Sequence, residues 1–373
     1  MDPLRIALIS PLYESVPPSL YGGTERVVSW LAEELVELGH DVTLFASGQS
    51  RTRAHLVEVI DRPLRLHLDG RLLDPYAMHV AMAQQVRSRA GEFDVVHSHI
   101  DYLGFSAFRD SPTPMLTTLH GRLDIEGLDM IHGCHAMPVV SISDAQRAAL
   151  PDARWIGTVY HGLPIDDYQF GCGSGDYLVF LGRFSREKRP EVAIEVARRA
   201  GVKLVIAAKV DEGDREFYDD VIAPMIRRAR SCVEYIGEVD DREKVELLRN
   251  ARALLFPVLW PEPFGLAMIE ALACGTPVIA RRCGSIPEVI DHGHTGFVCD
   301  DDDALVDCIH DLDLIDRGDC RRQAEERFSS ARMAADYLSL YRALVEQARF
   351  DERRAHGRPS LTSPRSPRHL RGA

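Results

Sequence analysis

The chain has 373 residues, of which 45% are hydrophobic and 27% are charged, a composition typical of folded globular proteins. This length exceeds what one ordinary hydrophobic core organises, so it predicts two domains of roughly 150 residues each. The net charge of −13 argues against nucleic acid as a partner, because phosphate contacts need clustered Lys and Arg side chains.

The sequence lacks the usual signals for membranes, secretion and metals. No run of about 18 apolar residues is present, and the chain begins without the basic leader and apolar core of a signal peptide. The 8 cysteines are scattered without a Cys-x-x-Cys pair, so neither a zinc site nor a redox couple is indicated. We therefore expect a cytoplasmic protein with reduced thiols and no strong membrane signal. The sequence leaves the oligomeric state open.

The first half of the chain alternates short apolar strands with helical segments. A helix with Thr24 as its cap and Gly39 at its end is predicted between two strands, residues 6–9 and 42–46. Further strands are predicted at residues 95–97, 115–118 and 139–141.

The second half of the chain repeats this alternation of strands and helices. Residues 177–181 form an apolar run, as expected of a parallel strand covered on both faces. A helix is predicted from Pro190, which is tolerated at a first helical position, to Ala200. Further strands are predicted at residues 203–208, 233–236, 253–256 and 276–280. This alternation predicts an α/β protein made of two Rossmann-like, doubly wound domains that face a central cleft.

The predicted boundaries divide the chain into four parts. Residues 1–163 form an N-terminal Rossmann-like domain, and residues 164–320 form a C-terminal one. Residues 321–348 form a helical segment that we expect to pack back on the N-terminal domain. Residues 349–373 are rich in Arg, Pro, Ser and Gly and almost devoid of apolar side chains, so we expect a disordered basic tail.

The most informative segment runs Glu262-Pro-Phe-Gly-Leu-Ala-Met-Ile-Glu270. It follows a predicted strand and opens a helix, and α/β sheets bind anionic ligands at such places because the first amide N–H groups of the helix are free. We expect Glu262 to lie before the helix and Glu270 about two turns inside it, with both carboxylates facing the cleft. A lone pair of glutamates is more simply explained as a cap and a solvated helix residue. The surrounding motifs reverse that preference.

Six shorter motifs accompany this Glu-x7-Glu segment. In chain order they are YGGTE (21–25), TLHG (118–121), Gly182-Arg183 followed by Lys188, CGTPVIA (274–280), GSIPEV (284–289) and GHTGFV (293–298). Together they resemble family 4 of the retaining glycosyltransferases, which have the GT-B fold, over residues 4–341. The stretches PPSLYGGTERVV and TLHGRLD look most like a bacterial subgroup with UDP-glucose:tetrahydrobiopterin glucosyltransferase-like members. The resemblance implies a metal-independent hexosyltransferase with a nucleotide-diphosphate sugar as donor and a small molecule or glycan as acceptor. The subgroup likeness suggests UDP-glucose as the donor.

The resemblance also implies a role for each matched residue of the C-terminal domain, which would hold the donor. Glu262 would bind hydroxyls of the donor sugar beside the backbone amides of Phe264, Gly265 and Leu266. Glu270 would bind the ribose hydroxyls of the nucleotide.

The resemblance implies that residues of both domains contact the diphosphate and the reacting centre. Arg183 and Lys188 would hold the diphosphate, and Gly22 and Gly23 would bring the N-terminal domain's backbone up to the phosphate and the acceptor. His120 would lie over the sugar at the reacting centre. Because fixed positive groups stabilise a leaving diphosphate as its charge grows, neither a metal nor another cofactor is expected. The aspartate run at residues 300–303 is interpreted as a solvated loop.

Weaker candidates for acceptor binding lie on the N-terminal domain. His99 and Asp101 follow the predicted strand 95–97, and Asp124 follows His120 by four residues. A structural role explains His99 as well as acceptor binding does, and it explains Asp124 better. Glu288 is interpreted as a residue that hydrogen-bonds backbone and shapes the nucleotide pocket.

Three alternative functions differ in their chemistry. A retaining disaccharide phosphorylase shares the fold and the motif. An oxidoreductase is disfavoured because neither first βα turn carries Gly-x-Gly-x-x-Gly. A catalytically silent nucleotide-sugar-binding protein would lack at least one of the ligands named above, and all of them are present.

Overall fold

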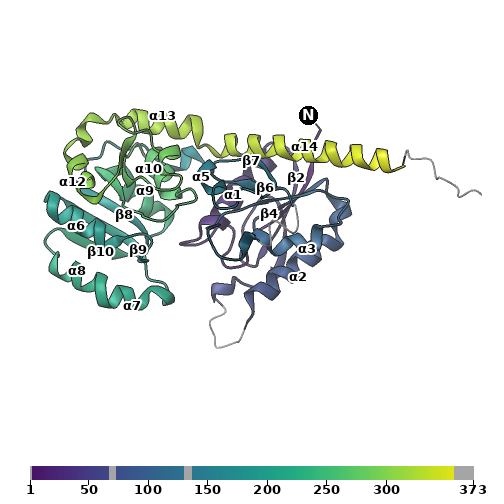
Figure 1. The fold of residues 1–373 in the computed structure, drawn as a ribbon, viewed down its shortest axis with the longest axis horizontal. Coiled ribbons are helices and arrows are strands. Elements are labelled where there is room, and N and C mark those ends of the chain that lie inside the picture. Colours follow the sequence, from purple (N-terminus) through teal and green to yellow (C-terminus); the bar gives the residue numbers. More distant parts are fainter. Residues whose placement is uncertain (1, 67–72, 130–136, 357–373) are drawn as a thin grey trace, which may run out of the picture.

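The computed structural model describes residues 2–66, 73–129 and 137–356, which form two α/β domains lying side by side (Figure 1). Each domain is built on one parallel sheet. The predicted pair of Rossmann-like domains is confirmed.

The N-terminal domain contains a seven-stranded parallel sheet with the order β3-β2-β1-β4-β5-β6-β7. Its strands are β1 (Arg5–Ile9), β2 (Asp41–Ser47), β3 (His55–Ile60), β4 (Val95–Ser98), β5 (Met115–Thr118), β6 (Val139–Ser141) and β7 (Trp155–Thr158). The strand order reverses between β1 and β4, and ligands bind outside the carboxyl ends of the strands at such a reversal.

The C-terminal domain repeats this topology with six strands in the order β10-β9-β8-β11-β12-β13. They are β8 (Tyr177–Arg183), β9 (Lys203–Lys209), β10 (Val233–Gly237), β11 (Ala253–Phe256), β12 (Val278–Arg281) and β13 (Gly296–Cys299). Here the order reverses between β8 and β11, so the second crevice lies at the carboxyl ends of these two strands.

Helices connect the strands in both domains. Those of the N-terminal domain are α1 (Gly23–Glu37), α2 (Pro75–Ser88), α3 (Phe105–Phe108) and α5 (Asp144–Arg147), with the 3-10 turns Leu64–Leu66, Ala90–Glu92 and Asp101–Gly104. Those of the C-terminal domain are α6 (Pro190–Ala200), α7 (Arg215–Phe217), α8 (Ala223–Arg228), α9 (Asp241–Asn250), α10 (Leu266–Ala273), α11 (Ile286–Val289), α12 (Asp302–His310) and α13 (Arg317–Arg327). Short 3-10 turns lie at Ile165–Asp167, Glu212–Asp214 and Leu312–Leu314, and Tyr218–Ile222 forms a π-helical turn.

A long C-terminal helix, α14 (Ser330–His356), leaves the C-terminal domain and runs along the N-terminal domain (yellow in Figure 1). Its side chains Met333, Tyr337, Tyr341 and Val345 are buried in the core of the N-terminal domain. The segment that we predicted as one helix is thus two, α13 and α14. Helix α14 also includes residues 349–356, which we had expected in a disordered tail, because Arg, Glu and Ala there favour helix and extend it at little cost. Residues 357–373 lie outside the described residues.

Two chain crossings connect the domains, and they touch each other. The amide of Leu163 donates to the carbonyl of Phe328 at 2.9 Å, and the amide of Ser330 donates to Leu163 at 2.9 Å. Gly162 is required at this point, because a Cβ there would lie 2.2 Å from the Ser329 carbonyl oxygen. The crossings therefore fix the relative position of the two domains at one edge of the cleft.

Helix α1 begins differently from the prediction. Gly22 is its N-cap residue and no side chain caps it, so the predicted cap at Thr24 is wrong, since Thr24 lies inside the first turn. The predicted end at Gly39 is confirmed, with a positive φ of 82°. An uncapped start leaves the first amide N–H groups of α1 without a side-chain partner.

The aspartate run at residues 300–303 is mostly exposed to solvent, as predicted, but Asp302 and Asp303 belong to the first turn of α12 rather than to a loop. Asp301 caps the helix by accepting from the amide of Ala304, and Asp302 pairs with Arg189 and Arg281 at 2.8 and 2.6 Å. Local ion pairs thus explain this acidic run.

Candidate functional site

A cavity of about 280 Å³ lies between the two domains, at the carboxyl ends of both sheets. Most of the residues that the sequence assigned to donor binding line it, and these are Gly22, Gly23, His120, Lys188, Glu262, Phe264, Gly265, Leu266 and Glu270. The N-termini of α1 and α10 open onto it from opposite domains. Both carry the positive end of a helix dipole, so the cavity is suited to an anion.

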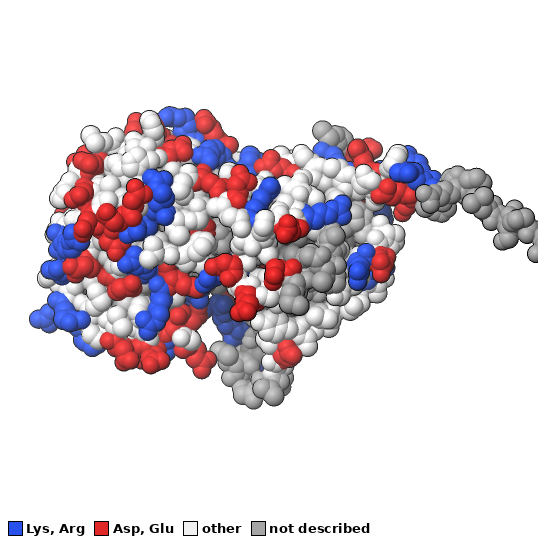
Figure 2. All heavy atoms as spheres, viewed as in Figure 1, with Lys and Arg blue, Asp and Glu red and all other residues white. Residues whose placement is uncertain are grey.

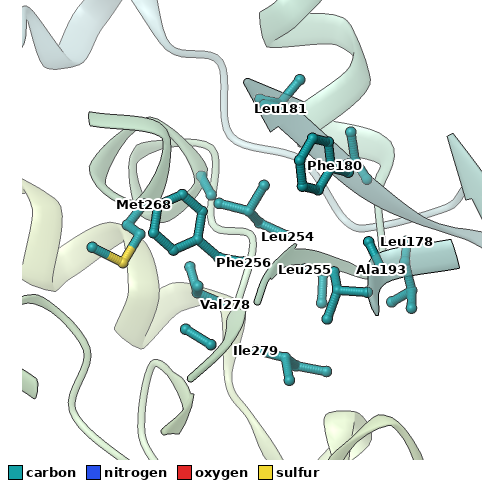
Figure 3. Packing of buried hydrophobic residues seen from close by; sticks show 14 of the residues in the cluster. Leu178, Phe180, Leu181, Ala193, Leu254, Leu255, Phe256, Met268, Val278 and Ile279 are labelled. Carbon is teal, nitrogen blue, oxygen red and sulfur yellow. The ribbon is translucent and has the colours of Figure 1, made fainter. Parts of the chain in front are cut away.

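The position of α10 depends on the core beneath it. Figure 3 shows the side chain of Met268 beside the ring of Phe256, with buried residues of β8, β11 and β12 to the right and below. Gly265, the N-cap of α10, has a φ of 88°, and a Cβ there would lie 2.7 Å from the Met268 methyl group. Only glycine meets both demands without strain, so the motif's glycine sets where the helix starts.

A neighbouring loop holds the backbone of Glu262. The amide of Ser285 donates to the carbonyl of Glu262 at 3.0 Å, and the Ser285 hydroxyl donates to the carbonyl of Phe264 at 2.9 Å. Gly284, at φ 51°, passes so close that a Cβ would lie 2.5 Å from both the nitrogen and the oxygen of Glu262. The GSIPEV and Glu-x7-Glu motifs therefore act as one structural unit.

The carboxylate of Glu262 pairs with Lys188. The Lys188 ammonium lies 2.5 Å from Oε2 of Glu262, and both side chains are largely buried. It also lies over the rings of Phe256 and Trp260, at 5.5 and 5.2 Å from their centroids. The lysine is thereby fixed at the cavity wall with its charge facing the motif loop.

The carboxylate of Glu270 has two partners. Its Oε1 accepts from the Lys244 ammonium at 2.6 Å and from the Tyr168 hydroxyl at 3.1 Å. Glu270 is the fifth residue of α10, a little more than one turn inside rather than the two turns we expected, because the helix starts only at Leu266. Both motif carboxylates nevertheless reach the same cavity.

The cavity also contains charged residues that sequence reasoning missed. Lys209, at the end of β9, pairs with Asp211 at 2.9 Å, and Arg26 of α1 pairs with Asp241 of α9. The carboxylate of Glu238 accepts the amide of Tyr21 at 3.1 Å. The last two contacts join the domains across the cavity. Only the tertiary fold brings these residues together, so no local spacing could have revealed them.

Arg183 does not line the cavity. It is the last residue of β8, and its guanidinium lies 3.4 Å from Asp211 and 3.9 Å from both Asp214 and Glu187. Those neighbouring carboxylates hold it beside the cavity rather than in it.

His120 lies in the wall contributed by the N-terminal domain. Its Nε2 is 2.8 Å from Nδ1 of His99, and its ring stacks on that of His161 at 5.2 Å. Burial lowers the pKa of His120 to about 3, so the ring is neutral at physiological pH. His161 packs edge-on against Phe264 at 4.9 Å, which connects this wall to the motif loop.

The acceptor candidates occupy different environments, and none of them lines the cavity. His99 is buried behind His120, and Asp101 accepts the backbone N–H of His120, while burial raises the pKa of Asp101 to about 6. Asp124 pairs with Arg122 at 2.8 Å, and Arg122 reaches Glu187 of the other domain at 3.1 Å. Asp124 thus belongs to a contact between the domains.

Glu288 accepts backbone hydrogen bonds, but from the other domain. Its carboxylate accepts the amides of Asp144 and Ala145 at 2.8 and 2.7 Å, and the hydroxyl of Tyr160 at 3.0 Å. It does not line the cavity, so the expectation that it shapes the nucleotide pocket is wrong. Its carboxylate is used for joining the domains.

Among the residues that the structure describes, no group of three or more His, Cys, Asp or Glu side chains is arranged to hold a metal ion. Within that same part of the chain no helix has the length and apolar character needed to cross a membrane. On the face seen in Figure 2, acidic and basic side chains are interspersed over the C-terminal domain.

Two family models match the chain, one on each domain. Residues 21–164 match the model described as Glycosyltransferase Family 4, and residues 173–327 match the model described as Glycosyl transferases group 1. Together these ranges cover most of the chain and include every motif of the cavity.

Individual proteins resemble the chain over nearly its whole length. The phosphatidyl-myo-inositol mannosyltransferase of Mycolicibacterium smegmatis is 24% identical over 81% of this chain and 82% of its own. The crystal structure of AviGT4, a glycosyltransferase involved in avilamycin A biosynthesis, has 26% identity and a TM-score of 0.69 over 92% of this chain and 99% of that one. Anabaena HepE, solved in complex with UDP and glucose, has 17% identity and a TM-score of 0.72 over 91% and 100% of the two chains. The expected GT-B fold is confirmed.

Proposed function

The chain is a family-4 glycosyltransferase, and on that premise we propose that it moves a hexose from a nucleotide-diphosphate sugar to a small-molecule or glycan acceptor. One observation carries this proposal. The two carboxylates of the Glu-x7-Glu motif lie in one cavity between the domains, on either side of the N-terminus of α10, and each is held by a lysine. This arrangement offers hydrogen-bond acceptors for two sets of hydroxyls with a site for an anion between them.

The proposed ligand occupies the cavity from Glu270 to His120. Glu270 binds the ribose hydroxyls, and its position inside α10 keeps it fixed. Lys188 and the amide groups at the starts of α1 and α10 hold the diphosphate, whereas Arg183 lies beside the cavity and is paired with Asp211. Glu262 binds hydroxyls of the sugar, and His120 lies over the sugar at the reacting centre.

We propose that transfer retains the anomeric configuration without a covalent enzyme intermediate. The leaving diphosphate takes the proton from the acceptor hydroxyl on the face from which it departs. In this proposal Glu262 accepts hydrogen bonds from sugar hydroxyls and does not act as a nucleophile. Positive groups that face the growing charge of the diphosphate lower the barrier more than they lower the ground state.

UDP-glucose is the donor that we propose. The likeness of the PPSLYGGTERVV and TLHGRLD stretches to UDP-glucose-dependent enzymes supports it, as does the complex of the structural neighbour HepE with UDP and glucose. No metal is required in this proposal, because Lys188, Lys209 and the two helix N-termini already supply positive charge at the cavity.

A thermal-shift screen tests the proposal first. The unfolding temperature is measured with UDP, GDP, ADP and their glucose and mannose derivatives, in excess EDTA. A nucleotide that binds the folded protein raises this temperature by mass action. We expect the largest increases with UDP and UDP-glucose, and a loss of both increases in Lys188→Met. The proposal is wrong if no nucleotide or nucleotide sugar changes the unfolding temperature.

Slow hydrolysis of the donor then tests the chemistry without knowledge of the acceptor. Proton NMR of glucose released from UDP-glucose in EDTA should show the α-anomer first, since the donor is α-linked. The β-anomer would contradict retention, and release only after Mg²⁺ or Mn²⁺ is added would contradict metal independence. Binding without release in the presence of acceptor mixtures would indicate a silent binding protein. Formation of sugar 1-phosphate from disaccharides and inorganic phosphate would indicate a phosphorylase.

A further inference from the structure

Four imidazole rings lie together behind and in the wall of the cavity. His97 packs on His99 with ring centroids 4.0 Å apart, and Nδ1 of His99 lies 2.8 Å from Nε2 of His120. The ring of His161 stacks on that of His120, with centroids 5.2 Å apart. Of the four, only His120 and His161 line the cavity. The other two rings therefore act on a ligand only through His120.

The deepest ring, His97, is fixed by two elements. Its Nδ1 lies 2.7 Å from the Tyr341 hydroxyl, and its Nε2 lies 2.8 Å from the Thr118 hydroxyl, which is itself 2.8 Å from the Tyr337 hydroxyl. Both tyrosines belong to α14, which crosses from the other domain. The buried ring against which His99 packs is thus held in place by hydrogen bonds from β5 and α14.

The hydrogen bond between His99 and His120 requires one N–H and one lone pair. Burial lowers the pKa of both rings well below its ordinary value, so each is neutral and carries a single N–H. Nε2 of His99 is buried and has no hydrogen-bond partner. Folded proteins tolerate an unpaired buried acceptor more readily than an unpaired N–H. His99 therefore keeps its N–H on Nδ1 and donates it to Nε2 of His120.

We propose that His99 is a positioning residue that holds His120 in its Nδ1–H tautomer. Nε2 of His120 is then used as an acceptor toward His99, and the nitrogen left for a ligand in the cavity is a donor. This inference deepens the proposed function, on which it rests, by assigning the proton at the reacting centre. A neutral donor there suits an oxygen of the sugar or acceptor that gains negative charge during transfer.

Nitrogen-15 NMR of the free full-length protein tests the tautomer directly, without any substrate. Two-bond correlations between the ring nitrogens and carbons distinguish Nδ1–H from Nε2–H imidazoles. The His120 signals are identified among those of the 15 histidines by their absence in His120→Gln. We expect the Nδ1–H pattern for His120. An Nε2–H pattern in the wild-type protein overturns the proposal, whether or not the protein transfers sugar.

Two variants of similar size test whether His99 is the cause. His99→Asn places an amide N–H close to the position of Nδ1, whereas His99→Leu offers no donor. In His99→Leu we expect the Nε2–H tautomer of His120 to appear and kcat to fall about tenfold, the value of one hydrogen bond, with unchanged affinity for UDP. His99→Asn should retain the tautomer and most of the turnover.

The outcomes separate this proposal from the proposed function. If His99→Leu keeps the Nδ1–H tautomer, His99 does not set it and the inference is wrong. If the tautomer responds as expected but no nucleotide sugar is turned over by the wild-type protein, the proposed function fails and the positioning role stands. Should His99→Leu not fold, the wild-type spectrum still decides whether His120 carries its proton on Nδ1, and an Nε2–H pattern overturns the proposal.

Discussion

At the scale of single residues, the cavity is organised by opposite charges that hold one another. Lys188 is held by Glu262, and Lys244 by Glu270. A diphosphate that binds Lys188 must therefore compete with a carboxylate for the same ammonium group. Neutralising Glu262 removes this competition, whereas neutralising Glu270 removes an acceptor of hydrogen bonds and the ion-pair partner of Lys244.

Glu25 of α1 offers a prediction about pH. Burial raises its pKa from the ordinary 4.5 to about 7, while its carboxylate accepts the amide of Glu14 at 3.3 Å. Between pH 4.5 and about pH 7, Glu25 keeps its proton in the folded protein but has released it in the unfolded chain. The free energy of unfolding therefore falls as the pH rises through this range. Glu25→Gln keeps an acceptor but cannot ionise.

We therefore expect Glu25→Gln to unfold at a higher temperature than the wild type at pH 8 and at nearly the same temperature at pH 4. Calorimetric scans of both proteins at the two pH values measure this. A stabilisation of equal size at pH 4 would show that the charge of Glu25 is not the cause.

Two glycines with positive φ provide a matched pair near the motif loop. Gly284 lies against the backbone of Glu262, whereas a Cβ at Gly293 would have no atom within 4 Å. Alanine at either position costs about 1–2 kcal/mol for the left-handed backbone. Only Gly284→Ala should also displace Glu262 and reduce turnover strongly. Donor turnover compared at equal folded fraction checks this, and equal activity of the two variants would contradict the coupling.

At the scale of elements, α14 completes a domain to which it is not adjacent in sequence. Tyr337 and Tyr341 are fully buried against the N-terminal sheet. Tyr341→Ala should destabilise the N-terminal domain by roughly 3–5 kcal/mol, the usual cost of deleting a buried aromatic ring. Tyr341→Phe loses only the hydroxyl that meets His97 and should cost about 1 kcal/mol. Denaturant unfolding of the N-terminal domain measures both values, and a mild effect of Tyr341→Ala would show that α14 is dispensable there.

The elements differ in how well the sequence reveals them. Apolar runs predicted the central strands, because strands buried on both faces consist almost wholly of apolar residues. Strands β3 and β7 were not predicted. They lie at the two edges of their sheet and are only partly buried, so they carry no continuous apolar run. Strand β13 was not predicted, although most of it lies within the GHTGFV motif that carries the family resemblance.

The candidate site was predictable where it is local in sequence. The loop and the first two turns of α10 carry Glu262, Gly265 and Glu270 within one motif, so their common location follows from the strand–loop–helix pattern. Lys244 and Tyr168 reach Glu270 from distant segments, and only packing of α9 and the crossing segment brings them there. Charged partners of this kind leave no periodic signal along the chain.

At the scale of the whole molecule, the cleft depends on a few contacts between the domains. Glu288→Ala removes a carboxylate that accepts hydrogen bonds from the N-terminal domain. Its donors are the amides of Asp144 and Ala145 and the hydroxyl of Tyr160. We expect the two domains to separate further, with a larger radius of gyration in small-angle scattering. Asp291→Ala is the control, because Asp291 pairs with Arg327 of its own domain. An identical radius for both variants would show that Glu288 does not hold the cleft.

The most direct test of the account is a calorimetric titration with UDP in EDTA of the wild type, Glu270→Gln and Glu262→Gln. Glu234→Gln, which alters an exposed ion pair with Lys203, is the control. Each hydrogen bond to a charged carboxylate contributes roughly 1.5–3 kcal/mol, so Glu270→Gln should weaken UDP binding about tenfold or more. Glu262→Gln should bind UDP at least as well as the wild type and lose turnover instead. Equal losses of UDP affinity in both variants, or no binding by the wild type, would contradict the assignment of ribose to Glu270 and sugar to Glu262.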